Sequence, residues 1–69
     1  MVENKNSFKK FKEKITSNIS VGEFASVSNG IVEAEGIVHD INFYPVFDTI
    51  TVQVKGYDKK IRYVNIKNE

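Results

Sequence analysis

Residues 49–54 alternate strictly between polar and β-branched apolar side chains. The polar members are Thr49, Thr51 and Gln53, and the apolar members are Ile50, Val52 and Val54. This period of two predicts a strand with one buried face and one exposed face. A strand of this kind needs partner strands and an apolar layer over its buried face. The rest of the chain is therefore expected to supply that cover.

The segment IVEAEGIVHDIN predicts a long partner strand that bends at Gly36. Val32 and Ala34 share one face before the glycine, whereas Ile37 and Ile41 fall on the other face after it. Glycine tolerates the bulge or bend that such a change of face requires. A strand bent in this way can serve two sheets of a small barrel. Two short strands with a loop at Gly36 are the alternative.

The start of the chain predicts a disordered tail over residues 1–6 and an amphipathic helix over residues 7–19. Spacings of 3, 4 and 4 residues place four apolar side chains on one helical stripe, namely Phe8, Phe11, Ile15 and Ile19. Lysines cover the other faces, which is also typical of helices that bind nucleic acid or an anionic membrane. We favour a helix that caps the strands, because a short helix is marginal alone.

The remaining chain predicts further strands over residues 22–27 and one or two more over residues 61–66. Phe24 is a core candidate in the first of these strands, and Asn29-Gly30 is a typical hairpin turn. The predicted fold is mainly β with one N-terminal α-helix. It is a small five-stranded bent barrel over residues 22–67, SH3-like, Sm-like or OB-like, with the helix capping the barrel. All 69 residues form one domain.

This order of elements resembles the Sm/Hfq-like fold. The segment Asn29-Gly30-Ile31, the pair Gly36-Ile37 and Asp40 are similar to that family's Asn-Gly turn, second-strand glycine and following aspartate. The interval between the glycines is one residue longer than is usual there, and residues 60–63 differ from the family's second motif. The resemblance implies RNA binding and a cyclic oligomer.

Two basic ends bracket an acidic middle. Residues 1–20 and residues 55–69 each have a net charge of +3, whereas residues 21–54 have a net charge of −5 and no lysine or arginine. Such a layout can steer a charged partner. It can equally be self-complementary, with the basic helix near the acidic strand.

Composition excludes several classes of protein. The chain has no cysteine and one histidine, which excludes disulfides, thiolate metal sites and multi-histidine sites. No apolar run approaches the roughly 20 residues of a membrane span, and the N-terminus lacks the apolar core of a secretory signal. We therefore expect a cytoplasmic protein with no membrane association, no metal and no cofactor.

No set of residues predicts catalysis. Glu33 and Glu35 project from one face of a strand, as paired carboxylates for acid–base chemistry or a divalent ion would, but no other residue completes such a site. His39 and Asp40 are neighbours on a strand and point to opposite faces. Because P-loop, nucleophile-elbow and dinucleotide motifs are also absent from the sequence, we do not expect an enzyme.

Basic residues alternate with tyrosines near the C-terminus. This set, the predicted nucleic-acid site, comprises Lys55, Tyr57, Lys59, Lys60, Arg62 and Tyr63. Lysines and arginines neutralise phosphates and tyrosines stack on bases, so the leading hypothesis is a small non-enzymatic module that binds nucleic acid. The alternative is that these lysines only keep an edge strand from aggregating.

A second hypothesis is a protein-interaction module or a small regulatory, phage-type inhibitor. Its partner surface would be the aromatic loop after the long strand, with Phe43, Tyr44, Pro45 and Phe47 as candidate residues, or the acidic strand itself. Nucleic acid, a protein and further copies of the chain are thus the candidate partners.

Overall fold

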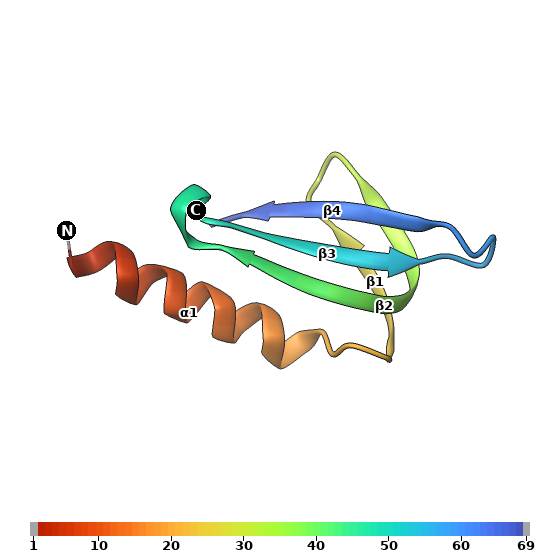
Figure 1. Ribbon diagram of the computed structural model, residues 1–69, viewed down its shortest axis with the longest axis horizontal. Helices are drawn as coiled ribbons and strands as arrows, with labels where there is room; N and C mark the ends of the chain where they lie inside the picture. Colours follow the sequence, from red (N-terminus) through yellow and green to blue (C-terminus); the bar gives the residue numbers. More distant parts are fainter. Residues whose placement is uncertain (1, 69) are drawn as a thin grey trace.

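The computed structural model describes residues 2–68, with side chains from residue 7 onward, as one helix and four strands (Figure 1). The elements are α1 (Val2–Asn18), β1 (Phe24–Ser28), β2 (Glu33–Tyr44), the 3₁₀ turn η1 (Pro45–Phe47), β3 (Thr49–Lys55) and β4 (Ile61–Lys67). The predicted helical bounds differ from these, because α1 already begins at Val2 within the segment predicted as a tail.

The strands form one antiparallel sheet in the order β1-β2-β3-β4, which curls into a half-barrel. The prediction of five strands is wrong, because β4 runs unbroken to Lys67. The apolar residues of β4 occur at both odd and even positions because both faces of this one strand carry apolar side chains. Val64 and Ile66 face the core, whereas Ile61 and Tyr63 lie on the other face and are exposed.

A single long strand, β2, serves both halves of the sheet, as predicted. Residues 33–37 pair with β1, and residues 37–44 pair with β3. Gly36 lies where the two pairings meet, and a Cβ added there would collide with the backbone carbonyl of Lys55. The glycine therefore permits a close backbone approach at the bend of the strand. The alternative of two short strands with a loop at Gly36 is wrong.

The predicted change of face does not occur at Gly36. Ala34, Gly36 and Val38 are all buried on one side of β2, so the alternation continues through the glycine. The register instead shifts between Val38 and Asp40, where a bulge inserts one residue. A bulge moves every following side chain to the opposite face, and it thereby brings Ile41 to the core.

The helical stripe packs over the inner face of the sheet, as predicted. Phe8 and Phe11 are buried with their rings edge to face, at 6.0 Å between centroids, and Ile15 and Ile19 pack beside them. The buried strand residues beneath are Val27, Ala34, Val38, Ile50, Val52, Val54 and Val64. The Phe24 prediction is wrong, since Phe24 points to the outer face and is 53% exposed.

Candidate nucleic-acid interface

The sheet has an outer face that α1 does not cover. The register of β3 and β4 places on this face Thr49, Thr51, Gln53 and Lys55 of β3 and Ile61, Tyr63, Asn65 and Lys67 of β4. We call these eight residues the outer face. It is polar and only lightly charged, and the β3–β4 turn extends it at the end of the molecule opposite the termini (Figure 1).

Tyr63 is the prominent aromatic side chain of the outer face. It lies opposite Gln53 on β3 and is 59% exposed. Lys55, one position further along β3 on the same face, is also exposed. A flat ring on a sheet with a cation nearby can stack on a base while the cation neutralises a phosphate.

Hydrogen-bonded amides surround the tyrosine and hold the outer face in place. The Thr51 hydroxyl donates to Asn65 Oδ1 at 2.7 Å, and Gln53 Nε2 donates to Asn42 Oδ1 of β2 at 2.6 Å. Thr51 is buried despite pointing outward. The amides therefore form an ordered polar floor, and their free donors and acceptors suit nucleobase edges.

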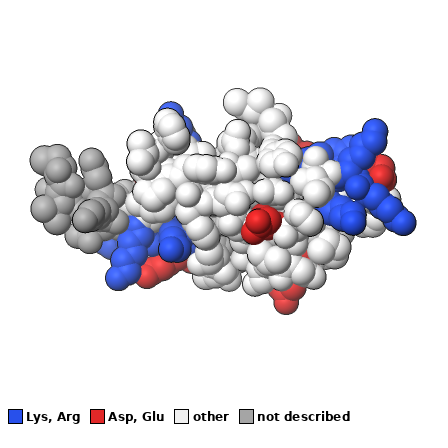
Figure 2. All heavy atoms as spheres, viewed as in Figure 1, with Lys and Arg blue, Asp and Glu red and all other residues white. Residues whose placement is uncertain are grey.

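The β3–β4 turn carries three further predicted residues, Tyr57, Lys59 and Lys60. Tyr57 is 82% exposed, and its ring centroid lies 6.3 Å from that of Phe24. Both lysines are exposed, and among the side chains of residues 7–68 neither forms an ion pair. On the face that Figure 2 shows, basic groups gather at the two ends of the molecule and the surface between them is mostly uncharged. The β3–β4 turn thus presents the positive charges of Lys59 and Lys60 at one end of the molecule.

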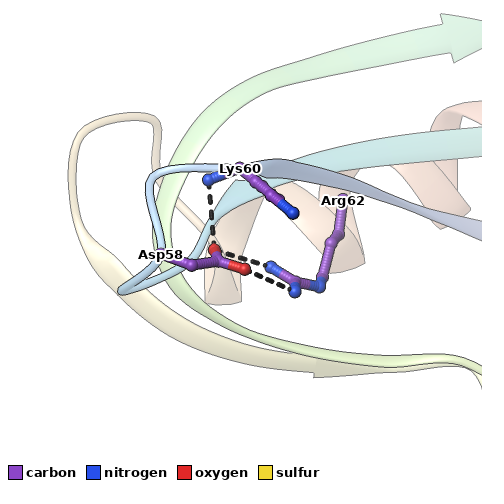
Figure 3. A network of polar contacts seen from close by, with 3 residues as sticks. All are labelled: Asp58, Lys60 and Arg62. Atoms are coloured by element: carbon purple, nitrogen blue, oxygen red, sulfur yellow. Dashed lines mark hydrogen bonds and ion pairs between the residues drawn. The ribbon is translucent and has the colours of Figure 1, made fainter.

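Arg62 is the predicted site residue that the structure separates from the others. It pairs with Val54, so it projects to the face opposite Tyr63. Its guanidinium forms a two-pronged ion pair with Asp58, at 3.0 Å and 2.8 Å between nitrogen and oxygen (Figure 3). It also lines a hollow of about 340 Å³ that includes Glu33 and Glu35. This acidic setting makes Arg62 a structural residue of the turn.

The ion pair stabilises the charged form of Asp58. Hydrogen bonds from the Arg62 guanidinium and from the Lys60 backbone N–H lower the pKa of Asp58 from 3.8 to about 2. The same contact raises the pKa of Arg62. Because the carboxylate's pKa is lowered by folding, the pair is intact above pH 3.8 and is lost as the pH falls through about 2.

We therefore expect the Asp58 side-chain carbon to titrate with a midpoint near 2 in an NMR pH series. In Arg62→Ala the midpoint should rise toward 3.8, because the larger of the two lowering hydrogen bonds is gone. A midpoint near 3.8 in the unmodified protein would show that the ion pair does not form in solution.

The residues of the predicted aromatic loop do not form one cluster. Phe43 and Tyr44 belong to β2, and only Pro45 to Phe47 form the turn η1. Phe43 points toward the helix, where Lys12 Nζ lies 4.8 Å from its ring centroid. Tyr44 is 44% and Phe47 is 69% exposed. Phe43 is 36% exposed but on the side of the helix, so the exposed groups of this region do not form one surface.

Two candidate residues were missed from the sequence. Lys67 shares the outer face with Tyr63, and Val46 in η1 is 90% exposed. Strict alternation from Tyr63 would have found Lys67, but the assumed break in that strand hid it. The sequence does not predict the exposure of Val46, because an apolar residue after a proline can be either buried or exposed.

Neither a bound metal nor a membrane segment is suggested for the described part of the chain. The side chains of residues 7–68 include no cluster of three or more potential metal ligands, and α1 lacks the length and hydrophobicity to cross a bilayer. Comparisons with protein-family models, with curated proteins and with solved structures find no match. We therefore infer function from the geometry of the site.

Proposed function

We propose that this domain binds single-stranded nucleic acid across the outer face and the β3–β4 turn. The observation that carries the proposal is the position of Tyr63, exposed on the sheet beside Lys55 and the amide floor. Stacking of a base on an exposed tyrosine needs an unpaired base, and it contributes about 1–3 kcal/mol per base. The exposed lysines of the turn would hold the phosphates.

The acidic part of β2 limits this surface. Glu33 and Glu35 project outward on the half of β2 that pairs with β1, and Asp40 lies opposite Gln53. These carboxylates repel the phosphates of nucleic acid. The bound nucleic acid should therefore follow β3 and β4 toward the turn and avoid β1. Arg62 is excluded from the proposed contacts because Asp58 already holds it.

Fluorescence anisotropy with a labelled oligothymidine and with a duplex of equal length tests this proposal. We expect the single strand to bind more tightly. If Lys55, Lys59 and Lys60 neutralise about three phosphates, a fourfold rise in salt should weaken binding about 20-fold. Tyr63→Ala should weaken binding roughly 5- to 150-fold at constant salt, since it removes one stacked base.

A matched pair of double variants separates the site from net charge. Lys59→Ala with Lys60→Ala should reduce the slope of log affinity against log salt by about 1.4. Lys9→Ala with Lys10→Ala removes the same charge from exposed positions of α1, and it should change affinity little. Equal losses in both double variants, or no binding at low salt, would contradict the proposal.

Exposed apolar side chains favour protein binding at η1 as a second candidate function. Val46 and Phe47 are exposed, and Val46 lines a hollow of about 180 Å³ together with Ser7, Pro45 and Asp48. Exposed apolar groups next to a hollow are typical of protein contact surfaces. If oligonucleotides fail to bind, a pull-down with the unmodified domain and with Val46→Asp would test this candidate, whose partner should be lost in the variant.

A further inference from the structure

The strand β1 is a border strand of the sheet that residues 2–68 form, so one of its edges is free of a neighbouring strand. The Val38 N–H donates to the Glu23 carbonyl at 2.9 Å, and the Asn29 N–H donates to the Val32 carbonyl at 3.1 Å. Backbone groups of an antiparallel strand point alternately toward and away from the neighbouring strand. In the register of β1 with β2, the outward-pointing residues are therefore Phe24, Ser26 and Ser28.

This edge lacks the features that usually protect a border strand. β1 reads FASVS and contains no charged residue and no proline, and its register with β2 has no bulge. The opposite border, β4, carries Arg62 and Lys67, and Asn29 Nδ2 donates to its Asn65 carbonyl at 2.7 Å. Unprotected edges of this kind pair readily with a further strand.

An apolar hollow lies beside the free edge. It has a volume of about 410 Å³ between β1, the second half of α1 and β4, and its apolar lining includes Ile15, Ile19, Ala25, Val27 and Ile66. Of these only Val27 is fully buried, and the others remain half-exposed. A strand added to β1 would extend the sheet and cover this lining, so the edge combines backbone pairing with hydrophobic burial.

We propose that two copies of this chain form a dimer by antiparallel pairing of their β1 strands. The two-fold axis passes through Ser26, which faces the partner's Ser26, while Phe24 faces the partner's Ser28. This register is self-complementary because each outward-pointing residue meets another outward-pointing residue. The uncharged sequence of β1 suits a second copy, since no like charges meet along the strands.

The charges near the hollow give the dimer a distinctive salt dependence. Lys14 is the charged side chain among the residues that line the hollow. Two copies bring two such lysines toward each other, so added salt should strengthen the dimer by screening their repulsion. Binding of nucleic acid should weaken under the same change. The dimer is thus independent of the proposed function and can be tested separately.

Sedimentation velocity over micromolar to millimolar protein concentrations tests the dimer. We expect reversible association in the unmodified protein. Ser26→Lys should raise the dimer dissociation constant at least tenfold, because two ammonium groups then meet at the axis. Ser17→Lys adds the same charge at an exposed position of α1 and should leave association unchanged. Circular dichroism confirms that each variant is folded.

Cross-linking provides a second test that does not depend on affinity. The natural chain has no cysteine, so Ser26→Cys introduces one thiol per copy. Residues that face each other in a hydrogen-bonded antiparallel pair have Cα atoms about 5.5 Å apart, within reach of a short bis-maleimide. Covalent dimer should form with Ser26→Cys and not with Ser17→Cys. A monomer at millimolar concentration, or equal cross-linking of both variants, would overturn the proposal.

Discussion

Replacing Gly36 with alanine should destabilise the domain by about 3 kcal/mol. The added methyl group would collide with the backbone carbonyl of Lys55, where β2 passes from one half of the sheet to the other. A rigid backbone atom cannot move aside as a flexible side chain can, so the bend itself must open. A 69-residue domain rarely has more than about 3–5 kcal/mol of stability from its core. The variant should therefore be largely unfolded, as urea titration followed by circular dichroism would show.

Gly30→Ala is the matched control for this substitution. Gly30 also has a positive φ, of 93°, but a Cβ added there meets no atom within 4 Å. Its cost should be only the backbone strain of a left-handed residue, about 1 kcal/mol. Equal losses in the two variants would show that the close approach at Gly36 does not hold in solution.

Phe11→Ala should have a comparable effect through a different cause. Phe11 is 9% exposed and lies in the stripe that attaches α1 to the sheet, next to Phe8. Removal of a buried phenyl ring costs about 3–5 kcal/mol through lost burial and the remaining cavity. We expect a large drop in the thermal midpoint, measured by calorimetry, together with loss of helical circular dichroism, because α1 is marginal once undocked.

Phe47→Ala removes the same ring from an exposed position and serves as the control. Because Phe47 is 69% exposed, the change should alter stability by no more than about 0.5 kcal/mol. If Phe11→Ala is equally mild, α1 does not cover the inner face of the sheet.

The periodicity of the chain predicted which residues would be buried. The stripe from Phe8 to Ile19 and the alternation from Ile50 to Val54 both appear as core, because each repeats with the period of its element. The bend of β2 at Gly36 was also predicted, but from a change of face that the structure places at the bulge after Val38. The helical stripe and the strand alternation depend on local periodicity, which can be read from the sequence.

Errors arose where partner strands decide the outcome. The side chains of β2 change face at the bulge between Val38 and Asp40. The sequence around His39 has no feature that predicts a bulge. Phe24 is large and apolar, but its position in β1 places it on the outer face of the sheet. Only the register of β1 with β2 reveals this orientation. The fifth strand was inferred because apolar residues of β4 occur at both odd and even positions. An unbroken strand can carry apolar residues on both faces, so this pattern does not require a break.

The predicted site was treated as one surface, but the structure places Arg62 on the face opposite Tyr63. Arg62 and Tyr63 are adjacent, so strand alternation alone places them on opposite faces. The ion pair of Arg62 with Asp58 was not foreseen, since it depends on the geometry of the turn. The amide floor around Thr51 depends on the pairing of three strands and could not be assigned from one of them.

An NMR titration of the labelled domain with oligothymidine tests the central claim most directly. The outer face and the turn should respond, so the largest shifts are expected at Lys55, Tyr57, Lys59, Lys60 and Tyr63. The lysine side of α1 and the guanidinium of Arg62 should stay nearly unchanged. Shifts confined to α1, or none at low salt, would contradict a nucleic-acid site on this face of the sheet.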